Sequence, residues 1–180
     1  MRPEQWVIVD TLAPIILKHV RGDILEIGMG GSTDVLIKHA KLNSRNLFSC
    51  DIDQRKCVKK TSFHKVFCLP SIAFIEYMKD KQTGPSGKLA LGIIDGDHSS
   101  SVLGPELTYF ASRDVLASGG VIFLHDTNLY DRRRKIDAFC VKEQYEQDPN
   151  YDVFTWPYTA SSCGLTMIAH RDPKGPFYRR

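Results

Sequence analysis

Acidic, histidine and glycine residues gather in four short groups along the chain, and each group follows a short apolar run. Carboxylates and imidazoles in such places can hold cations, sugar hydroxyls or a divalent metal, and they can move protons. Glycines beside them let a ligand approach the main chain and the start of a helix. The groups are Glu26 with Gly28 and Gly30, Asp51, Asp95 with Asp97 and His98, and His125 with Asp126.

The elements that must position these groups are predicted to be strands. Short apolar runs over 24–27, 46–50, 65–69, 89–94 and 121–124 alternate with stretches of helical apolar spacing. This alternation predicts an α/β fold with a mostly parallel sheet covered by helices on both faces. Because ligands bind at the carboxyl ends of such strands, we expect the four groups to meet in one site.

The remaining elements complete a single domain over residues 1–180, with an N-terminal helix over 1–20 and a tail over 171–180. Ser32 or Thr33 is placed to cap the helix after the glycine loop. Further helices are expected over 54–60, 70–78, 102–116 and 131–147, late strands over 153–156 and 165–169, a loop over 81–88 and a turn over 118–120.

Composition and charge indicate the expected cellular location and partners of the protein. Apolar runs are too short to cross a membrane, and the first residues do not read as a signal peptide. Five cysteines without a CxxC pair indicate reduced thiols in a cytoplasmic protein. A net charge of +3 gives no reason to expect a nucleic acid partner, and the sequence leaves a homo-oligomer open.

The charge beside the glycine loop discriminates between nucleotide cofactors. Gly28 and Gly30 begin a GxGxxG pattern whose third position is Thr33, and Asp51 follows where an acid would meet ribose hydroxyls of NAD. The Glu26 carboxylate, however, would repel a pyrophosphate and attract a cation. S-adenosylmethionine carries an ammonium and a sulfonium and has no phosphate, so the pattern favours it. Alternatives are a purely structural turn at the glycines, and a solvated acid or helix cap at Asp51, with Asp53 competing for its role.

The chain also resembles the class I S-adenosylmethionine-dependent methyltransferases. The motifs are LEIGMGGST, CDID, IIDGDHSS, SGGVIFLHDT and CGLTMIAHR, and the likeness covers roughly residues 21–171. It is closest to the group with DGDHS and HDT strand ends, related to macrolide-sugar and catechol-type O-methyltransferases. The resemblance implies a Rossmann-like, seven-stranded sheet, the cofactor S-adenosylmethionine and a small hydroxylated acceptor.

Carried over to this chain, the resemblance implies specific cofactor contacts. Asp51 would hold the ribose hydroxyls, and Ser71 would lie near the adenine. Glu26 and the glycines would meet the methionine end. The full implied set is Glu26, Gly28, Gly30, Ser32, Asp51, Ile52, Ser71 and Asp95.

The same resemblance implies a catalytic and a metal position. His98 stands where the sugar methyltransferases place a general base, and Asp95 joins it in the catalytic set. A histidine ordinarily titrates near pH ~6.5 and can accept the proton of a hydroxyl as the new bond forms. Asp95, His125 and Asp126 match the residues that hold a divalent metal, Mg²⁺ or Mn²⁺. His125 replaces the usual carboxylate there, and imidazole suits Mn²⁺, Fe²⁺ or Zn²⁺ better than Mg²⁺.

Each assignment has a structural alternative. His98 could be a hydrogen-bonded loop residue that orders the helix start at 99–101, and Asp97 could cap that helix. The carboxylates of Asp95 and Asp126 could be satisfied by backbone amides. As a competing function, the chain could bind the cofactor without transferring a methyl group and engage a polyanion through the basic run 132–135.

Overall fold

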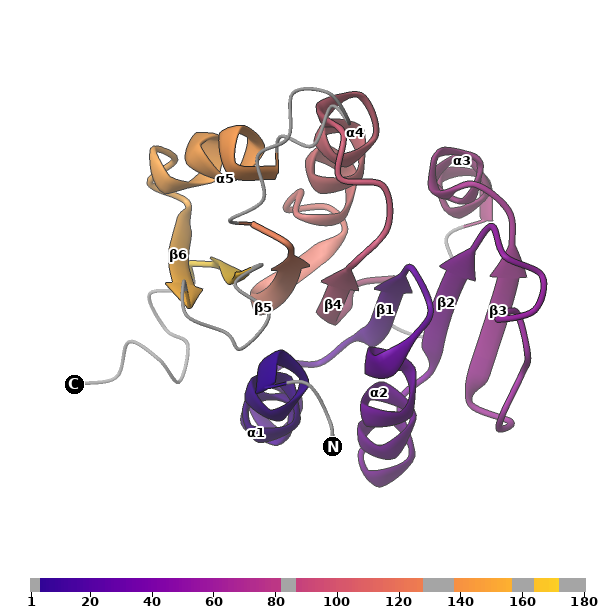
Figure 1. Cartoon of the computed structure of the whole chain (residues 1–180). Coiled ribbons are helices and arrows are strands. Elements are labelled where there is room, and N and C mark those ends of the chain that lie inside the picture. Colours follow the sequence, from indigo (N-terminus) through magenta and orange to yellow (C-terminus); the bar gives the residue numbers. More distant parts are fainter. Residues whose placement is uncertain (1–3, 82–86, 128–137, 157–163, 172–180) are drawn as a thin grey trace.

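The computed structural model describes residues 4–81, 87–127, 138–156 and 164–171. Within them, seven strands form one sheet in the order β3-β2-β1-β4-β5-β7-β6 (Figure 1). Every neighbouring pair is parallel except β5 with β7 and β7 with β6, so the expected mostly parallel, seven-stranded sheet is confirmed. The strands are β1 (Asp23–Ile27), β2 (Leu47–Asp51), β3 (His64–Cys68), β4 (Leu89–Ile94), β5 (Leu116–His125), β6 (Tyr151–Trp156) and β7 (Leu165–His170).

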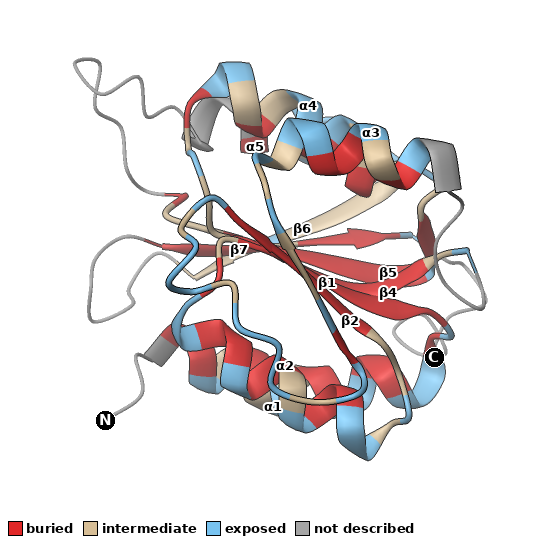
Figure 2. Ribbon diagram, turned by 90° about the vertical axis from the view of Figure 1, so that its right-hand side faces the viewer, coloured by how far each residue is buried: buried red, intermediate tan, exposed pale blue. Residues whose placement is uncertain are grey.

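Helices cover both faces of this sheet. Figure 2 shows α1 and α2 on one side and α3, α4 and α5 on the other. The central strands β1, β2 and β4 are buried along their whole length, which is why they read as continuous apolar runs. The helices are α1 (Glu4–His19), α2 (Gly31–Leu42), α3 (Ser71–Lys81), α4 (Ser100–Phe110) and α5 (Ala138–Glu146).

Alternate residues of the strands feed two separate apolar cores. On the side of α1 and α2, Ile24 and Leu91 pack with Trp6 and Leu36. On the opposite side, Leu25 and Ile122 belong to the core that includes Phe74 and Phe110 of α3 and α4. Successive strand residues point to opposite faces, so this division follows directly from the period of two.

Three expectations about local structure are wrong. Residues 54–60 form a turn and irregular chain in place of the expected short helix, since the Asp53 carboxylate accepts the Arg55 backbone N–H and fixes a turn. Helix α4 ends at Phe110, and β5 already begins at Leu116. The expected turn at 118–120 lies inside β5, where Gly119 has φ +76° and the pairing with β4 shifts register.

No helix within the described ranges has the length and apolar character that crossing a membrane requires. The three cysteines whose state the structure describes, Cys50, Cys57 and Cys68, are free thiols, as expected from the sequence.

Candidate active site

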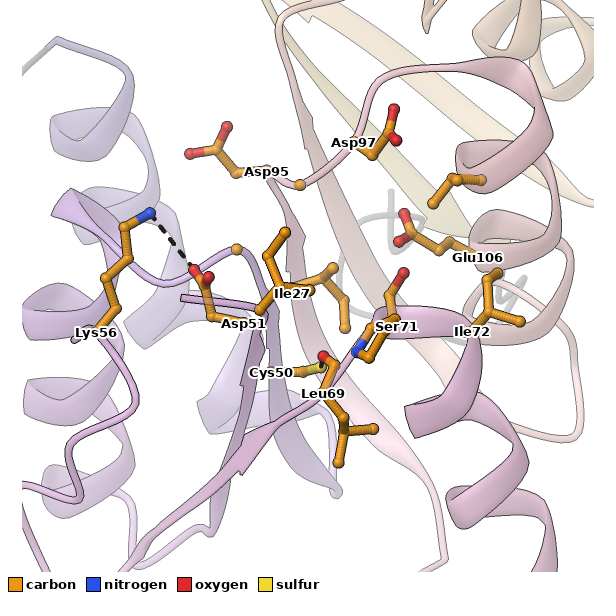
Figure 3. A pocket seen from close by; sticks show the side chains of 15 residues that line it. Ile27, Cys50, Asp51, Lys56, Leu69, Ser71, Ile72, Asp95, Asp97 and Glu106 are labelled. Atoms are coloured by element: carbon orange, nitrogen blue, oxygen red, sulfur yellow. Dashed lines mark hydrogen bonds and ion pairs between the residues drawn. The ribbon is translucent and has the colours of Figure 1, made fainter. Parts of the chain in front are cut away.

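A cavity of about 530 Å³ opens at the carboxyl ends of β1, β2 and β4 (Figure 3). Its walls are largely apolar, and carboxylates stand at several points around it. This is the edge of the sheet at which the sequence places its chemically active groups. The lining residues relevant here are Gly28, Asp51, Ile52, Ser71, Asp95 and Glu106.

The glycine loop forms one wall of the cavity. Gly28 has φ +82°, and a Cβ atom there would overlap the carbonyl oxygen of Asp95. Its N–H donates to the Cys50 carbonyl at 2.9 Å, and the Asp95 N–H donates to the Ile27 carbonyl at 2.8 Å. The loop therefore bridges the ends of β2 and β4, and only glycine fits at its first position.

Asp51 projects from the end of β2 into the cavity. One carboxylate oxygen accepts the Met29 N–H and the other accepts the Asp53 N–H, each at 2.7 Å. Lys56 Nζ lies 3.5 Å from the first of these oxygens. Asp53 does not line the cavity and instead pairs with Arg55 at 2.8 Å. Of the two competing acids, Asp51 is thus the one positioned toward a ligand.

Glu26 lies beneath the loop, fully buried. Its Oε1 accepts hydrogen bonds from the Ser32 hydroxyl at 2.6 Å and the Thr33 hydroxyl at 2.9 Å. Its Oε2 accepts one from the Ser49 hydroxyl at 2.7 Å. Burial raises the pKa of Glu26, and these hydroxyls oppose that rise. Glu26 thereby anchors the start of α2 to β1 and β2.

Three residues of the implied cofactor set, Glu26, Gly30 and Ser32, do not line this cavity. The N-cap position of α2 is Gly30, and the Thr33 hydroxyl accepts the Gly30 N–H at 2.9 Å, so Thr33 helps to cap the helix as expected while Ser32 does not. Contact of these residues with a cofactor stays a prediction.

Asp95, His98, His125 and Asp126 converge next to the cavity. One ligand atom from each lies within 4.8 Å of the others. His98 Nε2 is 3.2 Å from Asp126 Oδ2 and 3.8 Å from Asp95 Oδ1. His98 thus faces carboxylates. Asp97 bonds the helix start instead, accepting the Ser99 N–H at 2.9 Å.

The donor atoms at the centre of this cluster suit a divalent metal. His125 Nδ1 lies 2.8 Å from Asp95 Oδ1 and 3.0 Å from Asp126 Oδ1. Yet neither His125 Nδ1 nor Asp126 Oδ1 has a partner with hydrogen-bond geometry among the described residues. Ligand atoms bound at right angles to a metal at about 2.1 Å stand about 3 Å apart. Two carboxylates with imidazole form a donor set for Mn²⁺, Fe²⁺ or Zn²⁺.

The charges of the cluster are strongly coupled. Burial lowers the pKa of His125, but the carboxylates of Asp126 and Asp95 outweigh it and raise this pKa to about 9. Burial raises the pKa of Asp126, whereas His125 and His98 hold it well below its usual range. Without a metal, a protonated His125 balances the two carboxylates.

Helix α1 contributes two side chains that sequence reasoning missed. Gln5 Nε2 lies 3.0 Å from His125 Nε2, and the Trp6 ring stacks on the His125 ring with centroids 5.2 Å apart. Both side chains are buried. Both residues fall in the helix expected over 1–20, but nothing local in the sequence indicates that Trp6 would meet a residue 119 positions later.

Glu106 is a further cavity residue that the sequence analysis did not single out. It belongs to the buried face of α4 with Leu103, Leu107 and Phe110, so an acid at an apolar position of the helical pattern could have revealed it. The basic run 132–135, by contrast, lies outside the described residues.

Comparison with known proteins agrees with this architecture. Residues 25–127 match a family model described as a methyltransferase domain. A search of curated proteins gives no significant match.

Several solved structures, two of them named as methyltransferases, share the fold. Cofactor-bound Rv0187 from MTB superposes with a TM-score of 0.68 at 15% identity, covering 96% of this chain and 82% of that one. SAH-bound PaMTH1 from Podospora anserina gives 0.66 at 16%, covering 93% and 78%. Human Methyltransferase-like protein 13 in complex with SAH gives 0.63 at 13%, covering 97% and 84%. At these identities the likeness establishes the fold.

Proposed function

The chain belongs to the family of methyltransferase domains that its residues 25–127 match, and from this membership we propose that it transfers the methyl group of S-adenosylmethionine to a hydroxyl of a small sugar-like or phenolic molecule. One observation carries the proposal. Asp95 lines the cavity and also belongs to the cluster with His98, His125 and Asp126. A cofactor in the cavity would therefore stand beside groups able to bind and deprotonate an acceptor.

The cavity offers complementary groups along a nucleoside. Asp51 would accept hydrogen bonds from the ribose hydroxyls, because a carboxylate is a strong acceptor for a diol. Ile52 and Ser71 would border the base. Gly28 leaves the main chain bare where the sulfur would pass, and the Asp95 carboxylate favours the positive charge of the sulfonium and ammonium. Buried Glu26, when ionised, would add negative potential beneath the loop at the methionine end of the cofactor.

His98 is the proposed general base. Methyl transfer is an in-line displacement in which the acceptor oxygen attacks the methyl carbon, the bond from carbon to sulfur breaks, and the hydroxyl proton must leave. His98 Nε2 lies 3.2 Å from the Asp126 carboxylate and would carry a proton toward it. The opposite ring nitrogen, Nδ1, has no hydrogen-bond partner among the described residues and would take the hydroxyl proton, and the carboxylate would stabilise the resulting imidazolium.

Asp95, His125 and Asp126 would hold a divalent metal. A bound metal supplies Lewis acidity that lowers the pKa of a coordinated hydroxyl. These three side chains would also set the position in which the acceptor hydroxyl binds. This alignment matters as much as proton removal, since positioning alone accounts for much of a displacement rate.

The direct test is transfer of a labelled methyl group from S-adenosylmethionine to catechol and to UDP-glucose, with and without Mn²⁺. We expect product with at least one acceptor class, and loss of about 10²-fold or more in kcat for His98→Ala while S-adenosylhomocysteine binding persists. Failure of the wild-type protein to bind S-adenosylhomocysteine would refute the cofactor assignment.

The matched control is His170→Ala. His170 is also buried, but it lies at the opposite end of β7 from Leu165, the residue that pairs with His125. We expect it to retain transfer. Binding of S-adenosylhomocysteine without transfer to any hydroxyl compound, together with salt-sensitive binding of a polyanion, would instead identify a non-catalytic binding protein.

A further inference from the structure

Glu106 is a buried acid whose carboxyl group is poorly satisfied by the described residues. Its exposed fraction is 0%, and neither carboxylate oxygen has a partner with hydrogen-bond geometry among the described residues. The Ser71 hydroxyl, near it in Figure 3, opposes the effect of burial on its pKa but does not complete its bonding. Buried polar groups are almost always satisfied, so an orphaned carboxyl on a cavity wall indicates a missing ligand.

The position of Glu106 in the cavity indicates which part of a ligand it would meet. Asp51 and Lys56 stand at one end of the pocket in Figure 3, and Glu106 stands at the other, beyond Ser71. Ile27 and Leu69 lie between them, and the lining also includes the apolar residues Ile72 and Val102. Such walls suit a flat aromatic base that extends from a ribose held at Asp51.

A base that reaches Glu106 can bind it by donating a hydrogen bond, because a carboxyl group keeps an accepting oxygen in either protonation state. The edge of adenine carries an exocyclic amino group, which is such a donor. We propose that Glu106 accepts a hydrogen bond from the exocyclic amino group of the cofactor's adenine and thereby selects adenine over purines that lack this group. The inference rests on the proposed function, which places S-adenosylmethionine in this cavity.

The alternative is that Glu106 is an internal structural acid. A structural acid would hold neighbouring elements through its own bonds, as Glu26 does with three hydroxyls. Glu106 makes no comparable set among the described residues. Its removal should therefore alter ligand selection and leave folding intact.

The experiment compares S-adenosylhomocysteine with its 6-deamino analogue, in which hydrogen replaces the amino group, by calorimetric titration. The wild-type protein should bind S-adenosylhomocysteine about tenfold more tightly than the analogue, as expected for a hydrogen bond to a buried carboxyl group. Glu106→Leu, which removes the acceptor at similar volume, should bind both with equal, weak affinity. Glu106→Ala serves the same purpose if the leucine variant does not fold.

Two further variants make the result specific. Glu106→Gln keeps an oxygen acceptor and should keep the preference for the amino compound. Glu76→Leu removes an exposed acid of α3 outside the cavity and should change neither affinity. A wild-type protein that binds both compounds equally, or a Glu106→Leu protein that keeps the preference, overturns the inference. No binding of S-adenosylhomocysteine by the wild type would instead refute the proposed function.

Discussion

Gly28 and Asp95 touch across neighbouring parallel strands: the position that a Cβ of Gly28 would occupy is already taken by the Asp95 carbonyl oxygen. The contact arises because β1 pairs with β4 up to Ile27 and Ile94, immediately before these residues. Gly28 belongs to the loop beside the cavity, and Asp95 belongs to the histidine and aspartate cluster. The cavity and the candidate catalytic cluster are thus joined by a direct backbone contact.

Substituting Gly28 tests this contact. Gly28→Ala places a side chain at φ +82° and against backbone atoms that cannot move independently. We expect the free energy of unfolding, measured by urea denaturation, to fall by about 2 kcal/mol or more. Affinity for S-adenosylhomocysteine should fall with it, since the loop would be displaced.

Gly30→Ala is the control within the same loop. Gly30 has φ 179°, outside the left-handed region, and an added Cβ would have no atom within 4 Å. Its free energy of unfolding should fall by about 1 kcal/mol or less, the usual cost of alanine at an N-cap. Equal losses in both variants would show that the Asp95 contact is not the cause.

Much of this arrangement could be predicted from the sequence because strand ends are local features. Apolar runs located β1 and β4, and the rule that ligands bind at carboxyl ends placed Gly28, Asp51 and Asp95 around one cavity. The expected helix over 54–60 failed because a side-chain bond from Asp53 competes with helix formation, and that competition is decided by local geometry.

Other parts of the site depend on contacts between distant residues. Nothing local in the sequence indicates that Gln5 and Trp6 would pack against His125, since α1 reaches β5 only in the assembled fold. The Glu26 carboxylate was correctly located beside the loop, but its three hydroxyl partners come from α2 and β2. Such networks are set by tertiary packing.

The Glu26 network predicts a cost for losing Ser49. Its hydroxyl donates to Glu26 Oε2 at 2.7 Å and lies 2.9 Å from His64 Nε2. Ser49→Ala leaves both buried groups short of a partner, so the free energy of unfolding at pH 7 should fall by about 1–3 kcal/mol. Ser118→Ala in β5 changes an exposed hydroxyl and should have little effect. A similar loss in both would contradict a special role for the network.

Glu106 should make stability depend on pH. Burial, partly offset by the Ser71 hydroxyl, raises its pKa to about 7 from an ordinary value of 4.5. The unfolded chain then releases this proton more readily than the folded one. The contribution of Glu106 to the free energy of unfolding is therefore fully present below pH 4.5 and is lost as the pH rises through 7. Between pH 5 and pH 8 the loss from this group is about 2–3 kcal/mol.

Glu106→Gln isolates that contribution, because the amide does not titrate. Urea unfolding of the ligand-free proteins at several pH values should show the variant gaining on the wild type as pH rises from 5 to 8. All other ionisable groups cancel in the difference between the two proteins. A difference that does not change with pH would mean that Glu106 is not held neutral by burial.

Gln5 should influence metal binding through His125. Its amide lies 3.0 Å from His125 Nε2, and its own Oε1 is buried without a partner among the described residues. Turning the amide over would let Oε1 accept the Nε2 proton, leaving the Nδ1 lone pair directed toward Asp95 and Asp126. Groups that orient a metal ligand in this way change affinity by about 10- to 100-fold, so Gln5→Leu should weaken Mn²⁺ binding about tenfold in calorimetric titrations.

Gln54→Leu is the control for this prediction, since it changes a glutamine at an exposed turn, and it should bind Mn²⁺ as the wild type does. If Gln5→Leu binds Mn²⁺ unchanged while Asp126→Asn loses it, Gln5 does not orient His125 for metal binding.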